Sequence, residues 1–181
     1  NANYYISLGY QDVQGIAIND KFQRTTLRTN VSFNINENIK FGTNTQLSYI
    51  DRSGLSPSFG SNAAGAYFTN PLTNAYNPDG SLTLYPWPEE QYFTNPLAPT
   101  LVDNSNINNK IFTANYIEIK TPFVPGLSYK LNTGVEYSNR NERTYWGRDT
   151  ARGNLVNGEA IVENIVNENF LIENIINYEK G

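Results

Sequence analysis

Two long runs of alternating apolar and polar residues, joined by only three residues, leave this chain few possible folds. The first run extends from Arg24 to Ile35 and the second from Ile39 to Ile50, with Asn36-Glu37-Asn38 between them. A period of two is typical of β-strands, and a short polar connection predicts a hairpin. Each run has about 12 residues, whereas soluble strands usually have about 5–6 and membrane-crossing strands need about 9–11. The length therefore favours a membrane β-barrel.

Further strands are predicted at 4–10, 111–120 and 127–137. Both faces of 111–120 carry apolar residues, and we expect the isoleucine face to point outward. The C-terminal run fits two patterns, because its Ile and Val residues fall on one side of either a helix or a strand. Ile, Val and Asn are not strong helix formers, so we predict a strand from about Val162 to Tyr178, with a helix as the alternative.

The predicted connections alternate between short and long. The short turns are 36–38 and 121–126, and the long connections are 52–109 and 139–158. Outer-membrane barrels have short periplasmic turns and long outer loops. The chain 1–181 is therefore predicted to be all-β, with about six antiparallel up-and-down strands from an outer-membrane β-barrel. Six strands cannot close a membrane barrel, so we expect the chain to be a segment of a larger barrel.

Composition excludes several classes of function. The chain has no His and no Cys, which excludes Ser-His-Asp and Cys-His catalysis and predicts neither a metal site nor a cofactor. The net charge of −4, without a cluster of Lys or Arg, argues against a nucleic-acid partner. No apolar stretch is long enough for a membrane-spanning helix. Polarity comes instead from uncharged residues, including 28 Asn.

The carboxylates give little support for catalysis. Glu89 and Glu90 are adjacent in a proline-rich segment, which is typical of a solvated loop tip. A glycoside hydrolase that uses Glu89 or Glu118 is the enzyme hypothesis, but the two-carboxylate geometry that it needs cannot be located. We therefore predict that the chain is not an enzyme.

Aromatic residues in the long connections are the candidate ligand-binding groups. The candidates are Tyr85, Trp87, Tyr92 and Trp146, because aromatic rings can stack on sugars or hold apolar and peptide groups. In the alternative interpretation, Trp87 packs its loop against neighbours and Trp146 lies at the lipid headgroup level. The hexapeptide Tyr-Phe-Thr-Asn-Pro-Leu occurs at 67–72 and again at 92–97, and each copy predicts a turn.

A second set of candidates consists of polar residues that alternate with the apolar rows and would face a barrel lumen. The carboxylates of Glu118, Glu136 and Glu173 are predicted to form salt bridges there with Lys40, Lys130 or Arg28. The predicted lumen-facing residues are Arg28, Asn30, Lys40, Asn44, Gln46, Lys130, Asn132, Glu136 and Glu173.

Several short motifs occur in a defined order along the chain. They are Tyr4-Tyr5-Ile6-Ser7-Leu8-Gly9-Tyr10, Gln14-Gly15-Ile16, Phe22-Gln23-Arg24 with Arg28 and Asn30, Tyr76-Asn77-Pro78-Asp79-Gly80, Asn95-Pro96-Leu97-Ala98, Gly126-Leu127 and Glu173-Asn174 with Tyr178. In this order they resemble the SusC/RagA family of TonB-linked outer-membrane proteins. The resemblance implies a multi-pass β-barrel in the cell outer membrane that imports oligosaccharides or peptides. It also implies contact with membrane lipid, a SusD-like surface lipoprotein and a TonB-type energy-transducing protein. The last would act through the plug, a domain that fills the barrels of this family; we expect the plug and the remaining barrel strands to lie outside this sequence.

Two hypotheses from other classes stay open. A soluble carbohydrate-binding β-sandwich would use the same Tyr and Trp residues, and the apolar rows would then form its core. A small autonomous barrel with an adhesive or structural role would need at least two more strands than the sequence pattern predicts.

Overall fold

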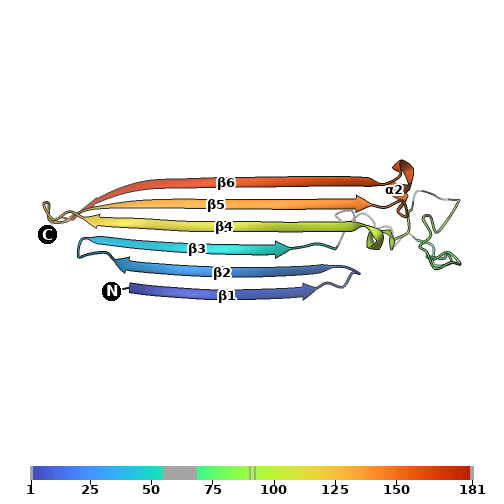
Figure 1. The fold of residues 1–181 in the computed structure, drawn as a ribbon, viewed down its shortest axis with the longest axis horizontal. Coiled ribbons are helices and arrows are strands. Elements are labelled where there is room, and N and C mark those ends of the chain that lie inside the picture. The colour runs from blue at the N-terminus through green and yellow to red at the C-terminus, as the bar shows by residue number, and fades with distance from the viewer. Residues whose placement is uncertain (1, 55–68, 90, 92, 180–181) are drawn as a thin grey trace.

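The computed structural model describes residues 2–54, 69–89, 91 and 93–179 of the chain. Its strands form one sheet in which each strand pairs antiparallel with the next along the chain (Figure 1). In sequence order the strands are β1 (Ala2–Gln14), β2 (Lys21–Asn34), β3 (Ile39–Asp51), β4 (Asp103–Lys120), β5 (Leu127–Trp146) and β6 (Glu159–Tyr178). The predicted all-β, up-and-down fold is confirmed.

The C-terminal segment is a strand, as predicted, and it begins slightly earlier than Val162. All 20 residues of β6 pair with β5, from Leu127↔Tyr178 to Trp146↔Glu159. Pairing with β5 gives every second backbone group of β6 a hydrogen-bond partner, which decides the conformation in favour of a strand over the helical alternative.

Two predicted loop boundaries are wrong. Strand β4 begins at Asp103 rather than near residue 110, and β5 continues to Trp146, so that 103–109 pair with 139–145. The connections are therefore 52–102 and 147–158. This extension has a single apolar residue, Ile107, and carries Asn104, Asn106 and Asn108 on the opposite side of β4, so it shows no apolar alternation by which to recognise a strand.

The register separates the side chains into two faces. Residues directly opposite one another point to the same side of a sheet, so rows of partners can be followed across all the strands. We call one side the apolar face. Three of its rows contain Leu8, Leu27, Leu47, Ile111 and Tyr137, then Phe33, Phe41, Ile117 and Leu131, and then Ile39, Ile119, Tyr129 and Ile176.

The isoleucine side of β4 thus shares the apolar face, as predicted. Aromatic residues concentrate at its two margins. Phe33 and Phe41 lie near the short turns with ring centroids 5.6 Å apart, and Tyr10 and Tyr49 lie near the long connections. The opposite side, which we call the polar face, carries the residues predicted to line a lumen.

The described strands do not form a second sheet, so neither face of the single sheet is covered as in a β-sandwich. Its two edges, β1 and β6, are not paired with each other, and no small closed barrel forms from the described residues. Both alternative folds are therefore wrong for this part of the chain.

Buried apolar side chains gather at the end of the sheet that carries the long connections. They are Ile50, Val102, Trp146 and Ala151. Two short helices, η1 (Ala98–Leu101) and α2 (Ala151–Val156), lie at this end (Figure 1). In the described residues, helices are too short and too polar to span a membrane.

A close contact on the polar face depends on a glycine. A Cβ added to Gly42 would lie 2.2 Å from Cε1 of Tyr116, which is directly opposite on β4. The Tyr116 ring therefore occupies the space that a side chain at position 42 would need.

We expect Gly42→Val to lower the free energy of unfolding of the intact protein by about 1–3 kcal/mol, because it overfills this space. The measurement is the urea midpoint in detergent or lipid. When Tyr116→Ala is added, Gly42→Val should no longer lower the free energy of unfolding. Gly9→Val is the matched control, because its Cβ would meet its nearest atom at 3.9 Å. Equal decreases in the free energy of unfolding for Gly9→Val and Gly42→Val would contradict this account.

Candidate functional site

The nine polar residues predicted to line a lumen share one face of the sheet. The pairs Asn30↔Asn44 and Arg28↔Gln46 join β2 to β3, and Asn132↔Glu173 joins β5 to β6. Lys40, Lys130 and Glu136 fall on the same side by the same register. The grouping follows from the pairing, whereas the assignment of this face to a lumen stays a prediction.

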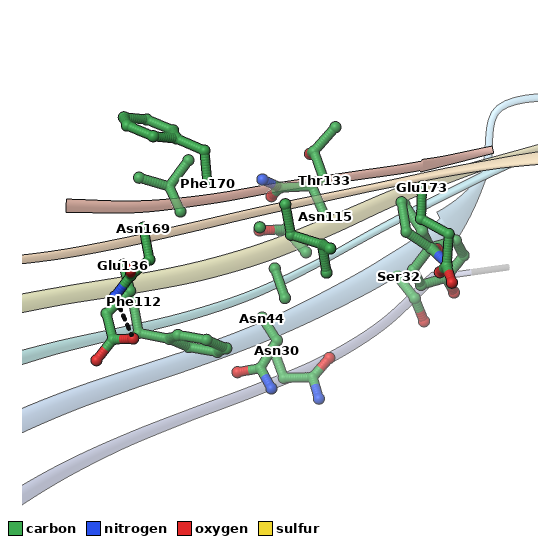
Figure 2. Close-up of a pocket in the computed structure, with 17 residues that line it drawn as sticks. Asn30, Ser32, Asn44, Phe112, Asn115, Thr133, Glu136, Asn169, Phe170 and Glu173 are labelled. Atoms are coloured by element: carbon green, nitrogen blue, oxygen red, sulfur yellow. Dashed lines mark hydrogen bonds between the residues drawn. The ribbon is translucent and has the colours of Figure 1, made fainter.

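The polar face is hollowed at its centre. The hollow has a volume of about 690 Å³ (Figure 2). Its floor forms where Ala114 and Gly134, two small residues, lie directly opposite each other on β4 and β5. The next rows on either side carry the larger Phe112 and Tyr116, which form walls. The volume is in the range of small-ligand sites.

Two carboxylates line this hollow, and each is held by an amide on the neighbouring strand. Asn132 Nδ2 donates to Glu173 Oε2 at 2.7 Å, and Asn169 Nδ2 donates to Glu136 Oε2 at 3.4 Å. The sequence did not reveal this pairing, because the Asn and Glu partners are about 30 to 40 residues apart.

The predicted salt bridges between these carboxylates and the lysines are not present. Lys40 and Lys130 lie over the ring of Tyr116, with Nζ at 5.8 Å and 4.9 Å from its centroid. In the part of the chain that the structure describes, the ion pair within 4.0 Å joins Arg152 to Glu159. Cation–π contact with Tyr116 thus takes the place of the expected ion pairs.

The candidate loop aromatics have different environments. Trp87 is 38 % exposed in the proline-rich segment, and Tyr85 is half-buried beside it. Tyr92 lies outside the described residues. Glu89 is exposed, and its neighbour Glu90 also lies outside the described residues.

Trp146 is not an outer-loop aromatic, contrary to the prediction. It is the last residue of β5 and is only 7 % exposed. The Arg152 guanidinium lies 3.9 Å from the centroid of its ring and donates two hydrogen bonds to Glu159, at 2.7 and 2.6 Å. These hydrogen bonds raise the pKa of Arg152. Trp146 thus anchors α2 to the sheet and offers little surface to a ligand.

The repeated Asn-Pro-Leu element forms the same turn twice. The backbone N–H of Leu72 donates to Asn70 Oδ1 at 2.9 Å, and that of Leu97 donates to Asn95 Oδ1 at 3.0 Å. Asn95 is also fully buried, and its Nδ2 donates to the carbonyls of Ala75 and Thr83. One amide therefore joins three segments of the long connection.

The Asn77-Pro78-Asp79-Gly80 motif forms the tip of the small hairpin that Asn95 holds. The Gly80 N–H donates to the Asn77 carbonyl at 2.9 Å. The hydroxyl and N–H of Ser81 donate to Asp79 Oδ1 and lower the pKa of that carboxyl. Its role is that of a turn, as these residue types predict.

Comparison with known proteins agrees with this architecture. No protein-family model matches the chain. Two TonB-dependent receptors of Formosa agariphila are 28 % identical over 170 residues and 29 % identical over 162 residues. These alignments cover 90 % and 87 % of this chain but 17 % and 14 % of the relatives, so the chain spans about a sixth of their length.

Solved structures share the fold. A structure of the RagAB peptide transporter matches 98 % of this chain and 20 % of its own chain, with a TM-score of 0.67 and 22 % identity. The closed-closed state of the RagAB peptide importer matches 81 % of this chain and 17 % of its own, with a TM-score of 0.56 and 23 % identity. The resemblance to RagA-type proteins is thus confirmed at modest identity. These relatives are receptors and transporters rather than enzymes.

We expect Asn95→Ala to loosen the long connection. The substitution removes the partners that Asn95 gives to the Leu97 N–H and the Thr83 carbonyl, and one of the two donors to the Ala75 carbonyl, at a cost of about 1–3 kcal/mol. Hydrogen exchange at the amides of Thr83 and Leu97 should accelerate. Asn70→Ala removes the equivalent turn acceptor at a more exposed site and should have a smaller effect. The same acceleration in both variants would refute a special role for Asn95.

We expect Arg152→Ala to release α2 from Trp146 and Glu159. Hydrogen exchange across 150–158 should accelerate, whereas Arg143→Ala, on the exposed end of β5, should leave this segment unchanged. Arg152→Lys should be intermediate, because lysine keeps the charge but loses the two-pronged hydrogen bond and the planar stacking. Full retention of protection in Arg152→Ala would show that the stacked arginine does not hold the helix.

Proposed function

We propose that this chain, which is related in sequence to TonB-dependent receptors, supplies six consecutive strands of an outer-membrane barrel that imports nutrients. The apolar face contacts lipid and the polar face lines the lumen. The observation that carries this proposal is the division of one uncovered sheet into an aromatic-bordered apolar face and a polar face. The barrel wall supplies a pathway, and the chain makes or breaks no bond.

The height of the apolar face supports this assignment. From Tyr129 to Tyr137 on β5 the apolar face has no charged residue, and Asn139 follows. The nine residues from 129 to 137 extend about 27 Å along the strand. A tilt of about 35–45° reduces this to a height of about 19–22 Å, which is most of the apolar band, about 25 Å tall, of outer-membrane barrels. Aromatic residues at both margins match the girdles of such barrels.

Polar side chains on the apolar face also pair with one another. Thr45 and Thr113 hydroxyls lie 2.9 Å apart, Thr113 donates to Asn115, and Tyr129 donates to Asn174. In lipid a polar group has no water to bond with, so pairing within the face favours contact with hydrocarbon.

The transported nutrient is an oligosaccharide or a peptide, captured together with a SusD-like surface lipoprotein and moved with energy from a TonB-type protein. RagAB, whose solved structures share this fold, is a peptide importer, which supports this class of activity. The long connections lie together at one end of the strands (Figure 1). They carry exposed Leu72, Tyr76, Trp87 and Leu155, and we assign this end to the cell surface.

Single-cysteine labelling tests the proposal, because these 181 residues contain no cysteine. Leu131→Cys on the apolar face should resist a water-soluble maleimide in outer membranes, whereas Asn132→Cys beside it should react. Glu89→Cys in the long connection should react in intact cells. Phe123→Cys in a short turn should react only after the outer membrane is permeabilised.

Within each pair, 131 with 132 and 89 with 123, one position serves as the control for the other. Equal reaction rates at 131 and 132 would show water on both faces and would reject the membrane assignment. Labelling of Phe123→Cys in intact cells would reverse the proposed orientation of the strands.

A further inference from the structure

The hollow on the polar face has two carboxylates without an ion-pair partner. Its lining includes Glu136 and Glu173 and, among the described residues, neither Lys nor Arg. Lys40 and Lys130 lie over the ring of Tyr116, a wall of the hollow, and neither forms an ion pair within 4.0 Å with these carboxylates. Two carboxylates that are not paired with a cation favour a cationic occupant.

The two carboxylates are held in place by neutral donors. Asn132 and Asn169 each supply one amide hydrogen bond, which orients a carboxylate without neutralising it. Each carboxylate has two oxygens and about four acceptor positions, so capacity is left for further donors.

An aromatic ring lies beside one of the carboxylates. Phe112 on β4 is directly opposite Glu136 on β5, and its side chain is 44 % exposed (Figure 2). A carboxylate next to an accessible aromatic face can bind an ammonium or guanidinium group through both charge and cation–π attraction. The small floor residues Ala114 and Gly134 leave room for an apolar stem.

We propose that this hollow binds organic cations carried by the transported substrate, as in the basic side chains of a peptide. The inference rests on the proposed import function and selects peptides over neutral oligosaccharides. Glu136 and Asn132, the partner of Glu173, are four residues apart on β5. Four residues of strand extend about 13 Å. An extended peptide with basic residues at positions i and i+4 places two cations at that spacing.

The test uses the intact outer-membrane protein, purified in detergent, and two blocked pentapeptides. They are acetyl-Lys-Ala-Ala-Ala-Lys-amide and the same peptide with glutamine in place of lysine. Calorimetric titration should show that the lysine peptide binds at least about tenfold more tightly, the scale of one charge-assisted hydrogen bond. Glu136→Gln and Glu173→Gln should each remove most of this preference.

Glu163→Gln is the matched control, because Glu163 is exposed on the same face of β6 but outside the hollow. It should keep the preference. Equal binding of the two peptides, no binding of the lysine peptide at millimolar concentration, or a preference that survives both substitutions would overturn the inference.

Two further readouts separate this inference from the proposed function. If Glu136→Gln lowers the melting temperature without changing peptide preference, the hollow holds an internal contact of the protein and the inference fails. If a neutral oligosaccharide such as maltopentaose binds and the lysine peptide does not, the inference also fails while nutrient import stands. Cysteine labelling tests the barrel assignment independently of both.

Discussion

The unbroken antiparallel ladder is the constraint on which the other features of this chain depend. Each strand pairs with its neighbours along nearly its whole length, so the central strands have hydrogen-bond partners on both sides. Because successive side chains point to opposite faces, one register determines both surfaces together. A slip of one residue between β4 and β5 would place Lys130 and Glu136 among the isoleucines of β4. The hollow, its carboxylates and the aromatic margins all follow from this pairing.

The end of the sheet with the long connections is stabilised differently. The connections there are not paired as strands, and contacts of individual side chains hold them in place. Asn95 joins three loop segments through five hydrogen bonds of its side chain and backbone, and Trp146 supports α2 through Arg152. Both residues are buried and neither is positioned to meet a ligand. The exposed aromatic Trp87 is the better surface for a partner or substrate at this end.

Sequence periodicity predicts the parts of this fold where the two faces differ in polarity. The hairpin of β2 and β3 and the shared face of the nine polar residues follow from alternation alone. The extension of β4 through Asn104, Asn106 and Asn108 cannot be recognised from the sequence, because Ile107 is its only apolar residue. The sequence places Trp146 in a loop, because its contact with Arg152 depends on a turn and a short helix that show no periodic signal. Likewise, the hollow depends on Ala114 facing Gly134, and only the register brings these two positions together.

The charge and apolarity of the two faces favour the proposed orientation of the sheet, with the apolar face toward lipid. Leu8 and Phe170 on the apolar face are 74 % and 72 % exposed, and burying such a side chain is worth about 1.5–3 kcal/mol. A second sheet could cover this face in a soluble protein, but the described strands form only one. The polar face cannot take the lipid position, because a Lys or Arg at the bilayer midplane costs about 2–4 kcal/mol and this face carries Arg28, Lys110 and Lys130. In the proposed orientation, lipid on one side and water on the other accommodate both faces, and Glu136 and Glu173 lie on the side that faces water.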